Sequence, residues 1–291
     1  MLIACNLMWA MQFTCIKLVQ DQVGPLFTIW APMLLATIML IPFFLTEKRE
    51  IKREWSDLLV LFRPVIFGSF PAQLLMTIGT QQSTATNAGL ITLILPISTV
   101  GFAVLLLEEK LTWSASLSIV IAVAGVICCS FQNISNFAFE DGYIVGNALI
   151  LLSVIANAYY NVSCKNLFLK FSDVEVVFFT YLIILIVLGP FVLYSESATF
   201  YKIPDFTLKT WTGLMLLAFF HNFLSMVLFF KALKNLSAIQ TGMSNYMITL
   251  FGMPIAVIWL GEKLDFITVL GGTLILFATF LLALSTRKPL S

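Results

Sequence analysis

The polar residues between positions 157 and 165 combine residue types and spacing that suit a binding surface on one face of a helix. Asn157 and Asn161 are four residues apart with Tyr160 beside them, and Lys165 follows after four more residues. Residues four apart share a helix face, so the two amides would point in one direction. Amides and phenols form hydrogen bonds without carrying a charge. We expect this face to bind a neutral or zwitterionic ligand, although hydrogen bonding between helices would also account for it.

A histidine and an asparagine stand together in a second apolar stretch. His221 is the only histidine of the chain, and Asn222 follows it. Because an imidazole changes charge near neutral pH, His221 could take part in proton coupling. Lining of a cavity and a plain hydrogen bond to a neighbouring helix remain open as well.

Further candidates occupy other apolar stretches. Trp9 and Phe13 are spaced to form an aromatic wall for an apolar or planar ligand. Gln73 and Asn245 place amides among apolar residues, where polar groups are costly and serve either function or packing between helices. The complete set of expected substrate-binding residues is Trp9, Gln73, Asn157, Tyr160, Asn161, His221, Asn222 and Asn245.

Several kinds of chemistry lack the residues that they need. No Asp or Glu falls in the middle third of an apolar stretch, where a proton-driven exporter of organic cations would normally use a carboxylate. A carrier of phosphorylated compounds needs buried cations, and the stretch 238–260 contains no Lys or Arg. One histidine, no paired carboxylates and five cysteines without ligand spacing give no basis for an enzyme, a metal site or a cofactor.

The elements that carry these residues are long apolar segments. The chain is 60% hydrophobic and 11% charged, with a mean hydropathy of +0.99, whereas soluble domains carry roughly 25% charged residues. A membrane-spanning helix needs about 20 apolar residues. We expect an all-α polytopic membrane protein, and its net charge of +1 gives no reason to expect nucleic acid as a partner. The ten expected transmembrane helices are 2–19, 26–45, 58–80, 87–107, 112–131, 143–164, 174–194, 211–233, 238–260 and 265–285.

The placement of lysine and arginine predicts the orientation of these helices. With the N-terminus in the cytoplasm, 12 of the 16 basic residues fall at cytoplasmic helix ends and 4 at outer ends. Basic residues accumulate on the cytoplasmic side of membrane proteins. We therefore expect a multi-pass protein of the cell membrane with both termini in the cytoplasm. The first helix starts at residue 1, so we also expect that a natural N-terminal tail is missing.

The two halves of the chain resemble each other when one is shifted along the other. A shift of 153 residues brings Glu109 onto Glu262, each followed by Lys-Leu, and a shift of 148 brings Lys17 onto Lys165. We expect two five-helix repeats, 1–132 and 143–286. Because five is odd, the second repeat enters the membrane inverted, as in many secondary transporters with a substrate site between the repeats. The two glutamates are expected to anchor helix ends or to form gating salt bridges, and direct contact with the substrate is the alternative.

Short segments of the two halves carry a pattern that resembles a known family. These segments, with Lys17, are Asn6 to Ala10, Ala85 to Gly89 and Leu107 to Leu111, and then Ala156 to Asn161, Ala238 to Gly242 and Leu260 to Leu264. Through them the whole chain resembles the EamA-type transporters of the drug/metabolite transporter superfamily. The resemblance implies ten helices, cytoplasmic termini, alternating access and a central cavity lined mainly by the first, third, fourth, sixth, eighth and ninth helices. Val154 stands where the repeat would place a second Asn6, so no role is carried over for that asparagine.

On these grounds we predict a secondary transporter that moves a small neutral or zwitterionic metabolite, such as an amino acid, across a cell membrane by alternating access. An exporter of organic cations or drugs and a channel-like facilitator remain the alternatives, and no enzyme activity is expected. The expected partners are a small-molecule substrate and the lipid bilayer. Proton coupling and the choice between monomer and homodimer stay open, and no cofactor is expected.

Overall fold

The computed structural model describes residues 1–46, 55–83, 85–110 and 141–260, together with residues 113–114, 116–121, 124, 270, 273–274, 277–278 and 281. The regular elements within these parts are all helices. Six helical stretches are long and apolar enough to cross a membrane, which makes the chain a membrane protein. These stretches are Leu2–Val19, Pro25–Thr46, Leu58–Gln82, Ile144–Leu167, Asp173–Ser195 and Leu208–Asn235.

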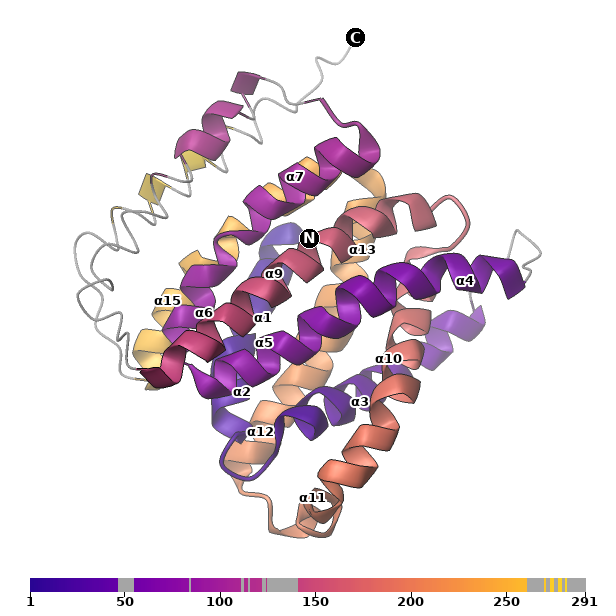
Figure 1. The fold of residues 1–291 in the computed structure, drawn as a ribbon, viewed down its shortest axis with the longest axis vertical. Helices are drawn as coiled ribbons and strands as arrows, with labels where there is room; N and C mark the ends of the chain where they lie inside the picture. Colours follow the sequence, from indigo (N-terminus) through magenta and orange to yellow (C-terminus); the bar gives the residue numbers. More distant parts are fainter. Residues whose placement is uncertain are drawn as a thin grey trace.

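The described helices are labelled in their order along the chain (Figure 1). In order they are α1 Leu2–Ala10, α2 Gln12–Val19, α3 Pro25–Thr46, α4 Trp55–Pro64, the π-helix η1 Val65–Ser69, α5 Phe70–Gln82, α6 Ala85–Thr92, α7 Leu95–Leu107, α9 Asp141–Leu167, α10 Asp173–Ser195, α11 Ser197–Tyr201, the 3₁₀ turn η2 Ile203–Asp205, α12 Leu208–Leu216, the π-helix η3 Leu217–Leu224, α13 Ser225–Asn235, α14 Ala238–Ser244 and α15 Tyr246–Leu260.

Six of the expected helices coincide with the six candidate spans, with ends that differ by no more than 3 residues. Two others, 87–107 and 238–260, each consist of two shorter helices, α6 with α7 and α14 with α15. The remaining two, 112–131 and 265–285, lie largely outside the described residues. The count of ten helices therefore stays a prediction.

Local sequence explains where several helices begin. The Ser172 hydroxyl accepts a hydrogen bond from the Glu175 amide at 3.1 Å, and the Glu175 carboxylate accepts one from the Ser172 amide at 3.0 Å. Ser237 and Gln240 make the same reciprocal pair at the start of α14. These capping boxes satisfy amides that the first helical turn leaves without partners, and they end the preceding loops sharply.

Helices α5 and α9 pack closely and run side by side across the middle of the molecule (Figure 1). A Cβ atom added to Gly79 would lie 2.7 Å from the Gly146 carbonyl oxygen, so the two backbones nearly touch at this crossing. Small residues at such crossings allow helices to gain close van der Waals contact inside a bilayer. The contact holds α9, which carries Asn157 and Asn161, against the helix that carries Gln73.

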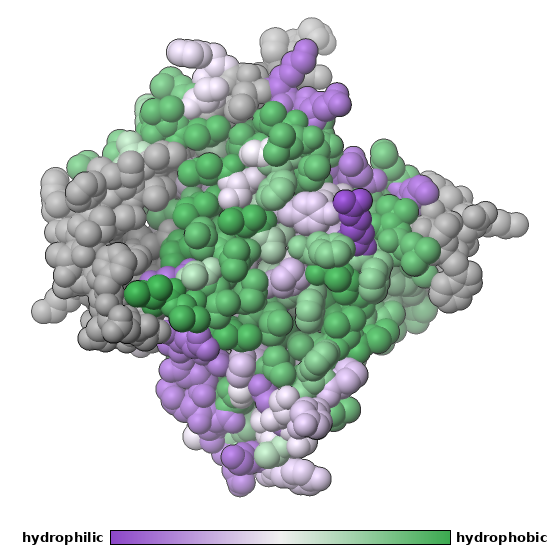
Figure 2. All heavy atoms as spheres, viewed as in Figure 1, coloured by the Kyte–Doolittle hydropathy of each residue, from purple (hydrophilic) through white to green (hydrophobic). Residues whose placement is uncertain are grey.

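Apolar side chains form both the core and much of the outer surface. In the core, the Trp9 ring lies 4.6 Å from Phe229 and the Tyr160 ring lies 6.0 Å from Phe230. Large side chains such as Leu105 are exposed. Figure 2 shows apolar residues across the middle of the visible face, with hydrophilic residues gathered toward its upper and lower edges. This distribution is the one that a lipid environment requires.

A π-helical segment interrupts each of two long spans. The segment η1 lies within Leu58–Gln82, and η3 lies within Leu208–Asn235. The first follows Pro64, which has no N–H to donate and so removes one intrahelical hydrogen bond. A π-helical turn redirects backbone carbonyls and side chains, and such turns occur often at functional sites.

Shallow interruptions divide the first span and the two expected helices 87–107 and 238–260. Met11, Ile94 and Asn245 keep right-handed backbone angles, with ψ values of −19°, −18° and −15°. An ideal α-helix has ψ near about −42°. At these three points the backbone therefore departs from ideal α-helical angles but stays in the right-handed helical region.

Candidate functional site

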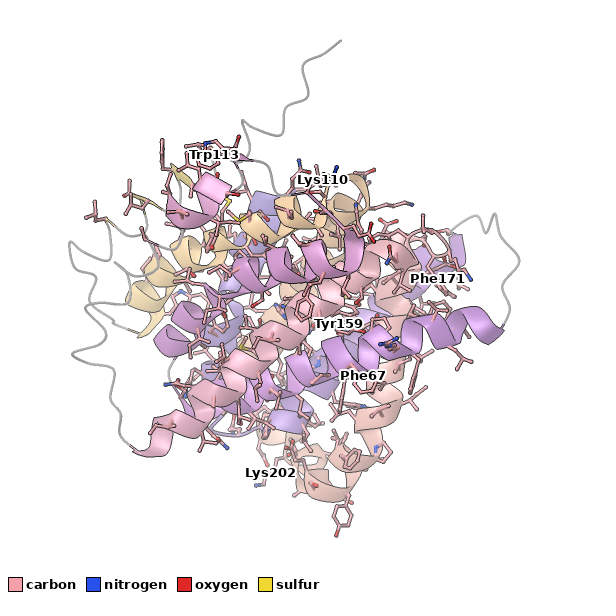
Figure 3. All side chains as sticks on the ribbon, turned by 45° about the horizontal axis from the view of Figure 1, so that its top comes forward. Phe67, Lys110, Trp113, Tyr159, Phe171 and Lys202 are labelled. Carbon is pink, nitrogen blue, oxygen red and sulfur yellow. The ribbon has the colours of Figure 1, made fainter. Side chains whose placement is uncertain are left out.

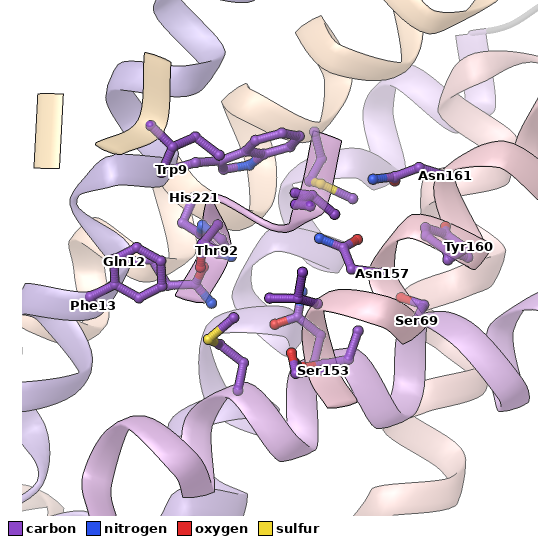
Figure 4. A pocket seen from close by; sticks show the side chains of 17 residues that line it. Trp9, Gln12, Phe13, Ser69, Thr92, Ser153, Asn157, Tyr160, Asn161 and His221 are labelled. Carbon is purple, nitrogen blue, oxygen red and sulfur yellow. Dashed lines mark hydrogen bonds between the residues drawn. The ribbon is translucent and has the colours of Figure 1, made fainter. Parts of the chain in front are cut away.

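A cavity lies among helices that are far apart in the sequence, and seventeen described residues line it (Figure 4). They come from α1, α2, η1, α5, α6, α7, α9, η3, α13 and α15. None of the seventeen is Asp, Glu, Lys or Arg. The lining residues are Trp9, Gln12, Phe13, Ser69, Ala72, Gln73, Met76, Thr92, Leu95, Ser153, Val154, Asn157, Tyr160, Asn161, His221, Met226 and Ile248.

The structure brings six of the eight expected binding residues to this cavity. They are Trp9, Gln73, Asn157, Tyr160, Asn161 and His221. Asn222 lines a smaller adjoining cavity, and Asn245 is in the lining of neither. Figure 4 shows the amides of Asn157 and Asn161 and the indole of Trp9 around one common space.

Two serines of the lining were missed from the sequence. Ser153 lies four residues before Asn157, so the same helical spacing that joins Asn157 to Asn161 could have found it. Its hydroxyl donates to the Ala72 carbonyl oxygen at 2.6 Å, which ties α9 to α5 at the cavity wall. Ser69 is the last residue of η1 and had no comparable signal, because its direction depends on the π-helical turn.

The phenol of Tyr160 has a structural partner. Its oxygen lies 2.7 Å from the Thr180 hydroxyl, in a buried hydrogen bond between α9 and α10. Within the cavity lining, Asn161 is buried and Asn157 is half-buried. The two amides are therefore better placed than the phenol to form hydrogen bonds with a ligand.

His221 and Asn222 lie in the π-helix η3, and both are buried. The two ring nitrogens of His221 have no hydrogen-bond partner among the described residues. The same is true of the side-chain oxygen of Asn222. The Asn222 backbone carbonyl accepts a hydrogen bond from the Tyr181 hydroxyl at 2.6 Å, and the His221 carbonyl accepts one from Ser225. Because buried polar groups normally have partners, these side-chain atoms are suited to bind water or a ligand.

The smaller cavity adjoins the first and has a polar lining. Gln12, Gln73 and His221 line both cavities and so stand between them. Thr28, Thr77 and Asn222 are the further polar residues of the smaller one. The two cavities are therefore neighbours that share Gln12, Gln73 and His221.

Asn245 occupies the interruption between α14 and α15. Neither polar atom of its side chain has a partner among the described residues. The neighbouring Ser244 receives hydrogen bonds from the Asn6 amide, at 3.0 Å on its carbonyl oxygen and 3.3 Å on its hydroxyl. This pairing gives Asn6 a place in the fold that the sequence left open.

The known proteins that this chain resembles in sequence are transporters. The sequence pattern of the EamA-like transporter family matches residues 1–131 and 144–284. A Bacillus subtilis (strain 168) protein named uncharacterized transporter YetK is 23% identical over 260 residues, which cover 88% of this chain and 77% of that protein. An uncharacterized transporter of Archaeoglobus fulgidus is 24% identical over 273 residues, 94% of each chain.

A solved crystal structure shares the fold. It superposes with a TM-score of 0.76 over 99% of this chain and 96% of the other, at 15% sequence identity. At that identity the likeness concerns the fold alone.

Proposed function

The chain belongs to the EamA-like transporter family, and on that basis we propose that it is a secondary carrier of a small neutral or zwitterionic metabolite, such as an amino acid or a related compound. In this proposal the carrier works by alternating access in a cell membrane. The observation that carries the choice of substrate class is the lining of the central cavity, whose seventeen described residues include four side-chain amides and no Asp, Glu, Lys or Arg.

An uncharged lining favours a substrate without net charge. A single buried charge is costly unless an opposite charge or several hydrogen bonds compensate it. Gln12, Gln73, Asn157 and Asn161 offer both donors and acceptors to one space. Such a set can pair with the carboxylate and the ammonium group of a zwitterion at the same time.

The aromatic and thioether residues of the lining suit an apolar substrate moiety. Trp9 packs against Phe229, with ring centroids 4.6 Å apart, and this contact holds the indole at the cavity wall. Phe13, Met76 and Met226 extend the apolar part of the lining. Methionine adapts its shape readily, so the apolar part would accept side chains of several shapes.

Pairs of matching contacts support the expected inverted repeats. The Lys17 ammonium donates to the Gln81 carbonyl oxygen at 3.2 Å, and the Lys165 ammonium donates to the Lys234 carbonyl oxygen at 3.2 Å. The two lysines match under the shift of 148 residues, and the two acceptors match under the shift of 153. A lysine at the end of one helix thus contacts the end of a corresponding helix in each half.

The irregular turns also recur at matching positions. Shifting η1, residues 65–69, by 153 residues gives 218–222, which lies inside η3 Leu217–Leu224. The interruption at Leu93 and Ile94 falls within two residues of the counterpart of Asn245 after the same shift. These matches support two five-helix repeats, 1–132 and 143–286, and ten transmembrane helices.

The distribution of lysine and arginine supports an orientation with both termini in the cytoplasm. With this orientation the ends that hold Lys165 and Lys234 face the cytoplasm, and the end that holds Lys17 faces outward. Proton coupling, if the carrier uses it, would involve His221, the one titratable imidazole of the sequence.

An exporter of organic cations is the second candidate. Trp9 and Phe13 place two aromatic rings in the lining, and aromatic faces attract cations. A permanent cation would still need a carboxylate to balance its charge, and the described lining has none. The neutral or zwitterionic substrate therefore agrees better with the cavity.

Counterflow in proteoliposomes tests the proposal. Purified protein would be reconstituted with a panel of unlabelled neutral amino acids, nucleobases, S-adenosylmethionine and a quaternary amine inside, and the same compounds labelled outside. Saturable accumulation of a neutral or zwitterionic compound is the expected result. Accumulation of the quaternary amine alone would favour the exporter of organic cations. Unsaturable entry of every solute would indicate a channel.

A further inference from the structure

Two charged side chains hold the short turn between α13 and α14. The Lys165 ammonium donates to the carbonyl oxygens of Leu233 at 2.6 Å and Lys234 at 3.2 Å, and also to that of Leu236. The Glu109 carboxylate accepts hydrogen bonds from the backbone amides that begin α14. These amides are Ala238, at 2.9 Å, and Ile239, at 3.2 Å.

The sign of each charge fits the helix end that it contacts. Helix α13 ends at Asn235, and the carbonyl groups of a helix C-terminus attract cations. Helix α14 begins at Ala238, and the amides of a helix N-terminus attract anions. Both helix ends are thus complemented by side chains from other helices, Lys165 near the end of α9 and Glu109 just after α7.

The residue before Glu109 has a left-handed backbone conformation. Glu108 has φ of 54°, the left-handed region, and is the one non-glycine residue with positive φ in the described part of the chain. Glycine or asparagine is usual at this position after a helix, because a longer side chain is strained there. The turn at Glu108 ends α7, with the Glu109 amide donating to the Ala103 carbonyl oxygen at 3.3 Å, and it redirects the chain so that the Glu109 carboxylate reaches α14.

Three of the four helices that meet at this turn, α7, α9 and α13, also line the central cavity. Leu95 of α7, Asn161 of α9 and Met226 of α13 are lining residues, and α14 leads into α15, which contributes Ile248. Lys165 lies four residues after Asn161 on the same helix face, which is about 6 Å along the axis. The contacts of Glu109 and Lys165 therefore fasten the cavity-lining helices together at one end.

We propose that Glu109 and Lys165 are gating residues that keep the cavity closed at this end, and that transport requires them to release the turn between α13 and α14. This inference rests on the proposed carrier function. In the expected inverted repeats, Lys17 with its contact to Gln81 is the counterpart of Lys165 at the opposite end. Glu262, the counterpart of Glu109, lies outside the described residues.

A cysteine in the cavity can report which end is open. Asn157→Cys would be made in a background in which the five native cysteines are replaced by alanine. Right-side-out and inverted membrane vesicles would be treated with a membrane-impermeant thiol reagent. Leu169→Cys and Lys202→Cys, both at exposed positions, mark the two faces. Figure 3 shows Lys110, the residue after Glu109, toward the upper end of the molecule and Lys202 toward the lower end.

With an intact Glu109 and Lys165, the cavity cysteine should react mainly from the face marked by Lys202→Cys. Glu109→Gln and Lys165→Gln should each raise labelling from the face marked by Leu169→Cys by roughly fivefold, because either change frees one helix end. The double variant should add little, since both side chains hold one turn. Lys231→Gln, at an exposed position on α13, removes a nearby positive charge without touching the turn, and it should leave the labelling as it was.

Exchanging the two charges separates helix-end recognition from a simple salt bridge. Glu109→Lys with Lys165→Glu keeps opposite charges together but puts a cation at the start of α14 and an anion at the end of α13. The exchange should therefore raise labelling at least as much as the single variants. Restored protection would show an ordinary ion pair and overturn the helix-end account.

The outcomes distinguish a failed gate from a failed carrier. The gating role would be overturned if Glu109→Gln and Lys165→Gln left the cavity cysteine labelled from the same face as in the parent protein, even if the two variants were less thermally stable. The carrier function would still stand. Equal labelling from both faces in the parent protein would show that Glu109 and Lys165 do not keep the cavity closed at this end, and it would also overturn the gating role. Failure of the carrier function is measured separately, as the absence of saturable counterflow by the parent protein. The gate would be supported if the cavity cysteine is protected from reagent on the face marked by Leu169→Cys in the parent protein and loses this protection in both variants.

Discussion

The side-chain amide of Asn6 donates to the carbonyl oxygen of Ser244 at 3.0 Å, across 238 residues of sequence. This bond joins α1 to the point where α14 gives way to α15, next to Asn245. Helix α1 carries Trp9, so the wall of the cavity and the interrupted helix are held in a fixed relation. This hydrogen bond gives Asn6, a polar residue in an apolar helix, a structural role.

Loss of this bond should lower stability. We expect Asn6→Ala to reduce the free energy of unfolding by about 1 kcal/mol, the usual size of a hydrogen bond between membrane helices. Thermal unfolding in detergent measures the effect. Thr249→Val removes a comparable bond, from Thr249 to the Gly89 carbonyl oxygen at 3.2 Å, and serves as the matched variant. An unchanged melting temperature in Asn6→Ala would contradict the structural role.

The amides of α9 should determine substrate affinity. We expect Asn157→Ala and Asn161→Ala to raise the KM for transport by about tenfold each, because a polar substrate would lose one hydrogen bond to the cavity wall. Expression and melting temperature should change much less. Asn166→Ala, at an exposed position on the same helix, is the control. If both cavity variants transport with normal KM, the binding site lies elsewhere.

Trp9 should act through both its ring and its N–H group. The indole nitrogen has no hydrogen-bond partner among the described residues, while the ring packs on Phe229. We expect Trp9→Phe to raise KM several-fold and to lower the melting temperature less than Trp9→Ala does, since the N–H donor and one ring of the indole are lost but an aromatic ring remains against Phe229. Trp9→Ala should also lower stability, by about 3 kcal/mol. A Trp9→Phe variant with unchanged KM would limit Trp9 to packing.

His221 should contribute hydrogen bonds to the cavity. Both ring nitrogens lack partners among the residues that the structure describes, and the ring lines both cavities. We expect His221→Gln to raise KM while the pH profile of counterflow keeps its shape. Measurement of counterflow between pH 5 and pH 8 decides the matter. A variant that keeps counterflow but no longer responds to a pH gradient would instead assign proton coupling to His221.

The crossing of α5 and α9 should tolerate no added methyl group. A Cβ on Gly79 would lie 2.7 Å from a backbone oxygen of α9, so Gly79→Ala should separate the helices and destabilise the protein by about 1–3 kcal/mol. Among the described residues, none has a heavy atom within 4 Å of a Cβ added to Gly101, so Gly101→Ala should be neutral or slightly stabilising. Equal melting temperatures for the two variants would show that the crossing is looser than described.

The sequence by itself determined the class of the protein and the six candidate spans that the structure describes. Hydropathy is a local property, so segments such as 174–194 could be recognised without knowledge of their neighbours, and the structure has a helix at Asp173–Ser195. Helical spacing likewise placed Asn157 and Asn161 on one face, and it would also have included Ser153. The pattern of short segments identified the family, because scarce charged residues are informative in an apolar chain.

Only the tertiary structure decided which polar groups face the cavity and which bind another helix. The phenol of Tyr160 pairs with Thr180, and Asn6 pairs with Ser244, because those partners come from helices that the spacing of α9 or α1 cannot reveal. Asn245 lies at an interruption and not in the lining of either cavity. The periodicity of a helix sets the direction of a side chain, whereas its partner depends on the packing of segments far apart in the chain.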